Sequence, residues 1–148
     1  MNFTMRHKIS LLILVSLFVS FNGYSIYPDA ILGKWYNAEK TSIIQIYKSG
    51  NSYNGKIVWL KEVTRNGKPR TDENNSDEKL RARLLMGMEM LSGFSFEDNQ
   101  WENGKIYDPR KGETYSCTIK MLDPNKLEVR GYVGISMFGK STIWTKAD

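Results

Sequence analysis

The chain has 148 residues, with 21 basic and 16 acidic side chains, one histidine and one cysteine. The formal net charge of +5 is mild and neither sign forms a long run, which argues against a nucleic-acid-binding surface. A single cysteine excludes a disulfide framework, and a chain of this length is expected to form one domain with a real core.

Residues 1–25 have the layout of a secretory signal peptide. A basic start at Arg6, His7 and Lys8 precedes an apolar run over residues 9–21, and small residues end the segment at Gly23-Tyr24-Ser25. We therefore expect export to the periplasm or the medium, with residues 26–148 as a mature single domain of 123 of the 148 residues. The apolar run is short for a membrane span, so no stable membrane anchor is expected.

Removal of this leader would also remove His7, the only histidine. The mature domain would then lack the base of serine–histidine and cysteine–histidine catalysis and the commonest zinc ligand. We expect no metal and no cofactor. Cys117 lies in an alternating segment and is expected to be a small buried hydrophobe, because nothing nearby would activate its thiol.

The mature chain is a series of short segments of strand-forming residues between turns. Alternation with period two runs through residues 42–48 and 53–61, and the short turn between them predicts a hairpin. The same alternation puts Cys117 with Ile119 and Leu127 with Val129. The expected strands are residues 33–37, 42–48, 53–61, 87–97, 100–107, 113–122, 126–132 and 140–146.

About eight strands joined mostly by short turns predict an all-β fold, an antiparallel up-and-down barrel of the lipocalin or streptavidin type. One long irregular connection follows the third strand, with a single helical turn expected within residues 80–86. Trp35 is expected to plug one end of the barrel beside a cation, either Arg130 or Lys146. The expected core includes Trp59, Ile106, Ile119, Val129 and Ile143.

The long connection allows three interpretations. Asp72, Asn74 and Ser76 have the spacing of calcium ligands, although an EF-hand loop needs glycine and glutamate further along. Alternatively, Arg81 and Arg83 could clamp a carboxylate or a phosphate. We favour a third, structural interpretation, in which a helical turn is capped by Asn75, Asp77 and Glu78 favour its dipole, and the arginines bind local carboxylates.

A second cluster surrounds a tight turn formed by Asp108-Pro109 and Gly112. Tyr107 and Tyr115 flank it and could place their hydroxyls near Asp108 at the barrel rim, although two packed tyrosines of a hairpin are slightly favoured. Loops on a rigid barrel often carry binding groups. The residues expected to meet beside one barrel mouth are Asp72, Asn75, Asp77, Arg81, Arg83, Tyr107, Asp108 and Tyr115.

Several short motifs follow one another along nearly the whole mature chain. They are GKW at 33–35, GKIVWL at 55–60, LRAR at 80–83, GKIYDP at 104–109, RGYVG at 130–134 and FGK at 138–140. In this order they resemble the exported bacterial family known as domain of unknown function 2147, which implies a β protein with no established activity. The family often has proline where Ser76 and Leu84 stand, so this loop is expected to be less rigid. The Gly-x-Trp opening is also similar to lipocalin-like proteins, as a fold-level analogy.

We expect a non-catalytic envelope protein that binds a small, partly apolar molecule at the barrel mouth, with Arg81 or Arg83 meeting an anionic group. Two alternatives stay open. A histidine-free enzyme would use Asp72 or Asp108 as an acid–base group assisted by Tyr107, which requires a carboxyl pKa displaced toward neutrality. A protein–protein interaction module would instead use an open strand edge or an apolar patch.

Overall fold

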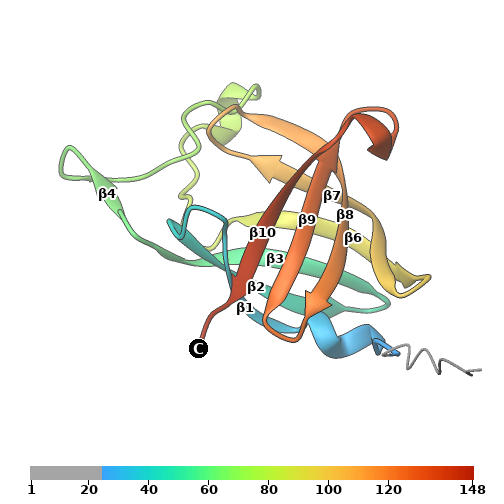
Figure 1. Ribbon diagram of the computed structural model, residues 1–148. Coiled ribbons are helices and arrows are strands. Elements are labelled where there is room, and N and C mark those ends of the chain that lie inside the picture. The colour runs from blue at the N-terminus through green and yellow to red at the C-terminus, as the bar shows by residue number, and fades with distance from the viewer. Residues whose placement is uncertain (1–24) are drawn as a thin grey trace, which may run out of the picture.

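The computed structural model describes residues 25–148, so nearly all of the expected signal peptide lies outside the described residues. Eight strands form a closed antiparallel barrel in the order β1-β10-β9-β8-β7-β6-β3-β2 (Figure 1). The barrel strands are β1 (Gly33–Tyr36), β2 (Ser42–Ser49), β3 (Ser52–Leu60), β6 (Glu89–Glu97), β7 (Gln100–Asp108), β8 (Glu113–Asp123), β9 (Lys126–Tyr132) and β10 (Lys140–Lys146). The predicted up-and-down barrel is thus confirmed.

Short additional elements lie outside the barrel wall. The 3₁₀ helix η1 (Pro28–Ile31) precedes β1, and η3 (Ser136–Phe138) lies between β9 and β10. The long connection, residues 61–88, carries the small hairpin of β4 (Thr64–Arg65) and β5 (Lys68–Pro69) and the 3₁₀ helix η2 (Glu78–Leu80). In Figure 1, η2 and η3 lie at one end of the barrel and η1 lies at the other. Within residues 25–148, no helix is long and apolar enough to cross a membrane.

The barrel interior is filled by side chains that alternate inward along the strands. Gly104 makes room for this packing, because a Cβ atom there would lie 2.4 Å from the ring of Phe94. The buried apolar cluster consists of Ile31, Trp35, Ile44, Ile46, Tyr53, Leu91, Phe94, Trp101, Cys117, Ile119, Leu127, Val129 and Trp144. Ile119 and Val129 are therefore in the core as predicted, and Ile106 packs against it while partly buried.

Trp35 closes the end of the barrel beside η1, as the sequence predicted. It is fully buried, and its indole Nε1 donates a 2.8 Å hydrogen bond to the carbonyl of Ile31. The Nζ atom of Lys146 lies 4.5 Å from the centre of the Trp35 ring and is the predicted cation. Trp101 donates to the carbonyl of Pro28 at 3.0 Å, so two indoles attach η1 to the barrel.

Two core predictions were wrong. Trp59 is 39% exposed, because a bulge between the pairs Ile43–Trp59 and Ile44–Ile57 shifts the alternation and moves Trp59 to the outer face. There it packs edge-on against Tyr36. Ile143 is 41% exposed, and the neighbouring Trp144 is the residue of β10 that enters the core.

The long connection also differs from its prediction. The helical turn lies at Glu78–Leu80 rather than within residues 80–86, and its N-cap is Asp77, whose carboxylate accepts a bond from the backbone N–H of Lys79 at 3.0 Å. Asn75 was expected in this role. Its side-chain oxygen instead accepts from the backbone N–H of Asp77 at 2.8 Å, which forms the turn that leads into η2.

Candidate functional site

A buried carboxylate holds the long connection against the barrel. Asp72 is fully buried, and its Oδ1 accepts a 2.6 Å bond from the hydroxyl of Tyr107 on β7. Its Oδ2 accepts bonds from the amide of Asn75 at 2.7 Å and from Nε of Arg83 at 2.8 Å. Both oxygens are therefore occupied, as a buried carboxylate requires.

The partners of Asp72 also contact one another. The guanidinium of Arg83 lies 5.3 Å from the centre of the Tyr107 ring, and the Asn75 amide donates to the Tyr107 hydroxyl at 3.0 Å. Burial, followed by the bond to Asp72, raises the pKa of Tyr107. Tyr107 therefore stays protonated over the physiological range and acts as a hydrogen-bond donor.

A second contact fixes the connection to the turn between β7 and β8. Gly112 has a φ of +70°, and a Cβ atom there would lie 1.8 Å from the carbonyl oxygen of Asn74. The Asn74 amide donates to the carbonyls of Pro109 at 3.3 Å and Arg110 at 3.2 Å. Glycine is thus required at position 112 both for its backbone conformation and for the close approach of the connection.

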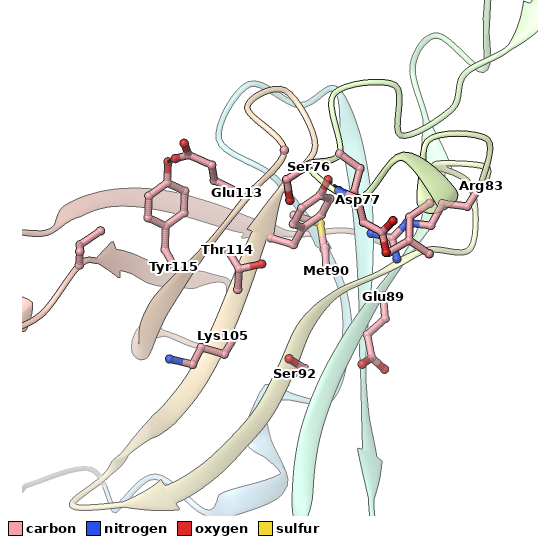
Figure 2. Close-up of a pocket in the computed structure, with 15 residues that line it drawn as sticks. Ser76, Asp77, Arg83, Glu89, Met90, Ser92, Lys105, Glu113, Thr114 and Tyr115 are labelled. Carbon is pink, nitrogen blue, oxygen red and sulfur yellow. Dashed lines mark hydrogen bonds between the residues drawn. The ribbon is translucent and has the colours of Figure 1, made fainter.

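A pocket of about 670 Å³ opens beside the hydrogen-bonded group around Asp72, between the long connection and strands β6–β8 (Figure 2). Lys105 pairs with Ser92 and Tyr107 pairs with Thr114, and these positions alternate with Gly104 and Ile106, which face the core. The pocket therefore follows the outer side of the barrel wall up to its rim. It is lined by Asn75, Ser76, Asp77, Leu80, Arg83, Glu89, Met90, Ser92, Lys105, Tyr107, Gly112, Glu113, Thr114, Tyr115 and Val133.

Most charged groups of the pocket already have partners. Glu89 accepts a bond from the hydroxyl of Tyr47, and Glu113 accepts one from the hydroxyl of Tyr115 at 2.7 Å. Lys105 differs, because its Nζ donates to the neutral hydroxyl of Ser116 at 3.0 Å and forms no ion pair within the described part of the chain. Figure 2 shows Lys105 extending from the strand on the side of the pocket opposite Arg83.

The structure brings together most of the residues that the sequence grouped. Asn75, Asp77, Arg83, Tyr107 and Tyr115 line the pocket, and Asp72 lies beneath it as the partner of Tyr107. Arg81 stands at the edge, where its Nε donates to the backbone carbonyl of Asn75 at 2.8 Å.

Asp108 is the exception in this group. It does not line the pocket and binds Arg110 through both carboxylate oxygens, at 3.0 and 3.1 Å. Burial opposes ionisation of Asp108, but the bonds from Arg110 outweigh it and lower the pKa. The alternative in which the Tyr107 and Tyr115 hydroxyls meet Asp108 does not hold, since these hydroxyls bind Asp72 and Glu113.

Sequence reasoning missed Met90, Ser92 and Lys105. The signal for Lys105 was available, because Lys105 and Tyr107 are two residues apart on one strand and must share a face. Met90 was hidden by a bulge, in which Gly55 pairs with Leu91 and Lys56 with Glu89, so that Met90 is the extra residue.

A second cavity, of about 940 Å³, lies between the β4–β5 hairpin and the β7–β8 turn. Arg65, Lys68, Arg70 and Arg110 line it together with one acid, Glu73. Arg65 is paired with Glu73, and Arg110 with Asp108 and Glu39, so two of the four cations are neutralised locally.

The acid–base alternative needs a carboxyl group whose pKa is raised toward neutrality. The pKa of Asp108 is instead lowered by the bonds from Arg110. The calcium interpretation does not hold for Asp72, because both its oxygens accept bonds from protein donors. Among residues 25–148, no three histidine, cysteine, aspartate or glutamate side chains are grouped to hold a metal ion.

Comparison with known proteins agrees with the barrel. The chain is similar to the solved structure of protein HP1028 from Helicobacter pylori, described as belonging to the lipocalin family. The TM-score is 0.68 at 20% identity, over 79% of this chain and 82% of that one, and shows the fold alone. No curated protein sequence matches. The model of a family described as an uncharacterized protein conserved in bacteria, DUF2147, matches residues 33–146, and the chain belongs to this family.

Proposed function

We propose that this protein is an exported, non-catalytic binding protein that holds a small, partly apolar molecule with an anionic group under the long connection. One observation carries the proposal: a single pocket of about 670 Å³ combines apolar Leu80, Met90 and Val133 with the cations Arg83 and Lys105. Pockets of roughly 300–1,000 Å³ with apolar walls and a few polar groups are typical small-molecule sites.

The proposed site is on the wall and rim of the barrel rather than in its centre. The interior is occupied by the buried cluster around Trp35, Phe94 and Trp101, so the ligand predicted at the barrel mouth is proposed to lie at its rim and outside the filled centre. The hydrogen bond between Tyr107 and Asp72 favours a pre-formed pocket, because it fixes the long connection, which forms one side of the pocket.

Lys105 is the residue proposed to meet the anionic group. Its ammonium donates to the hydroxyl of Ser116, and Ser92 and Thr114 line the same pocket. Arg83 is a weaker candidate, since Asp72 already neutralises part of its charge. Arg81, proposed from sequence, lies outside the lining. The basic start and apolar run of residues 1–25 support export.

Native mass spectrometry of protein purified gently from its own cell envelope tests the proposal. We expect the protein to carry a bound molecule of stoichiometric amount, and Lys105→Met to lose at least about nine-tenths of it. Lys120→Met is the matched control, because Lys120 is exposed on β8, the strand beside β7, but lies outside the pocket. Wild-type protein without any bound molecule, or equal loss in both variants, would contradict the proposal.

A further inference from the structure

One loop of the protein exposes several large apolar side chains to the solvent. Between β9 and β10, Val133, Ile135, Met137 and Phe138 are 75%, 57%, 75% and 77% exposed. Scattered surface hydrophobes are normal, but here four strongly exposed ones fall on a single loop, and concentrations of exposed apolar side chains mark interaction sites. We call these four residues the apolar tip.

The backbone of this loop is held in place rather than left free. Nε of Arg130 donates to the carbonyl of Ser136 at 2.7 Å, and Nη2 donates to the carbonyl of Met137 at 3.2 Å. Nη1 of the same guanidinium binds the hydroxyl of Ser141 at 3.0 Å. One arginine therefore links the tip to the start of β10, and its donors satisfy carbonyls that a loose loop would turn to water.

Two glycines allow this conformation. Gly134 has a φ of +76°, which side chains other than glycine rarely adopt. A Cβ atom at Gly139 would lie 2.7 Å from the carbonyl oxygen of Gly131 and 2.9 Å from Cβ of Tyr132, so the loop can close only with glycine there. The chain thus uses glycines and an arginine to present hydrophobic side chains to the solvent.

The charge around the tip is positive. Residues 130–140 contain Arg130 and Lys140 and no acidic residue. Lys111 lies on the neighbouring β7–β8 turn, with its Nζ 5.9 Å from the ring of Tyr115, and Tyr115 and Val133 line the same pocket. The acids at this end have partners: Glu113 is bonded to Tyr115 and Asp108 to Arg110. Asp77 and Glu89 line the same pocket as Val133, where Asp77 caps η2 and Glu89 is bonded to Tyr47. Cations beside exposed apolar side chains match an anionic surface that has an apolar layer beneath it.

We propose that the apolar tip docks the protein onto the surface of a lipid bilayer that contains anionic phospholipid. The loop that carries the tip projects from the end of the barrel in Figure 1. Four side chains are far fewer than the roughly 20–30 residues that each partner contributes to a stable protein interface. Insertion into a bilayer interface needs neither shape complementarity nor a large area.

This docking stands on the tip alone and does not require a ligand in the pocket. Since Val133 belongs both to the tip and to the lining of the pocket, docking would bring the pocket next to the bilayer surface. The two proposals can fail separately, because one is read from bound small molecules and the other from partitioning onto vesicles.

The test is co-sedimentation with sucrose-loaded vesicles. The full chain is expressed with its own leader and purified in the form that the host yields, with its intact mass recorded first. Vesicles of phosphatidylcholine with one-quarter phosphatidylglycerol are compared with vesicles of phosphatidylcholine alone, at low and high salt. We expect binding to the anionic vesicles, weakened by salt, and a loss of at least about tenfold in partitioning for Met137→Ser combined with Phe138→Ser.

Leu122→Ser is the matched control, because Leu122 is also an exposed apolar residue, at the β8–β9 end of the barrel. Its partitioning should equal that of the wild type, and urea unfolding should be unchanged in the tip variant. Equal losses in the tip and control variants, or unchanged binding by the tip variant, would overturn the proposal. The proposal would also be overturned if the wild type did not bind vesicles but dimerised through the tip, as measured by sedimentation.

Discussion

The hydroxyl of Tyr107 lies 2.6 Å from Oδ1 of Asp72 and joins a barrel strand to a connection that has left the barrel for almost thirty residues. Arg83 and Asn75 complete the shell of the carboxylate. The two bonds of Oδ2 come from within the connection and the bond of Oδ1 comes from the wall. This small network therefore decides where the connection, and the pocket beside it, are placed.

Removal of this carboxylate should be costly. We expect Asp72→Ala to lower the free energy of unfolding by about 2–3 kcal/mol, because it leaves Arg83 and Tyr107 without their buried acceptor while water can still reach part of Arg83. Urea denaturation measures the change. Glu73→Gln, at the exposed pair with Arg65, is the control and should cost under about 1 kcal/mol. Similar losses of unfolding free energy in the two variants would show that Asp72 does not hold the long connection in place.

Gly112 offers a second test of how the long connection is attached to the barrel. Gly112→Ala should cost more than Gly50→Ala by at least about 1 kcal/mol, because both positions have positive φ but a Cβ atom at Gly112 would overlap Asn74. At Gly50 nothing lies within 4 Å of the added carbon. Thermal unfolding of the two variants gives the comparison. Equal destabilisation would mean that the connection moves aside without cost.

Lys146 should stabilise the closed end of the barrel. Its ammonium lies over the Trp35 ring and also donates to the carbonyl of Leu32 at 3.3 Å. We expect Lys146→Met to lower the free energy of unfolding by about 1 kcal/mol, since the methionine keeps the apolar stem and loses the charge. Lys34→Met, at an exposed position of β1, should have no measurable effect. Equal values would rule out the cation–π contact as a source of stability.

Cys117 should be inert in the folded protein. Burial raises its pKa to about 12, from an ordinary value near 9.0, so the folded state keeps the thiol protonated. At pH 8 a thiol reagent should react at least about a hundredfold more slowly than in urea. Rapid labelling of the native protein would contradict burial of the thiol.

The same shift has a consequence for stability. Above pH 9 the unfolded chain releases the thiol proton and the folded chain retains it, so stability falls as the pH rises from about 9 to about 12. The limiting slope for one thiol is about 1.4 kcal/mol per pH unit. Cys117→Ala should flatten the decline over this range, which the pH dependence of urea midpoints measures.

The strands were predictable wherever a regular alternation met a regular partner. Cys117 and Ile119 on β8 and Leu127 and Val129 on β9 follow period two without interruption, and all four are buried. Trp59 was missed because the extra residue of a bulge reverses the faces, and a bulge depends on pairing with the neighbouring strand. Ile143 and Trp144 could not be separated, since two adjacent apolar residues fit either phase of the alternation.

The residues of the candidate site were predictable from the sequence, but their hydrogen-bond partners were not. Asp72, Asn75, Arg83 and Tyr107 were grouped by sequence, and the structure joins them by hydrogen bonds. The sequence offered only Asp108, the neighbour of Tyr107 in the chain, as an acid near its hydroxyl, because local turn chemistry cannot reveal a contact across 35 residues. The same limit hid the contact between Gly112 and Asn74, where the glycine appeared only as a turn residue.

The location of the bound molecule is the most direct test of the central claim, which is that a ligand occupies the pocket under the long connection. The measurement is a crystal structure of the protein purified with its bound molecule. We expect ligand density between Met90, Lys105 and Val133, with an anionic group within hydrogen-bond distance of the Lys105 ammonium. Density inside the barrel among Trp35 and Trp101, or an unfilled pocket in crystals of the loaded protein, would contradict it.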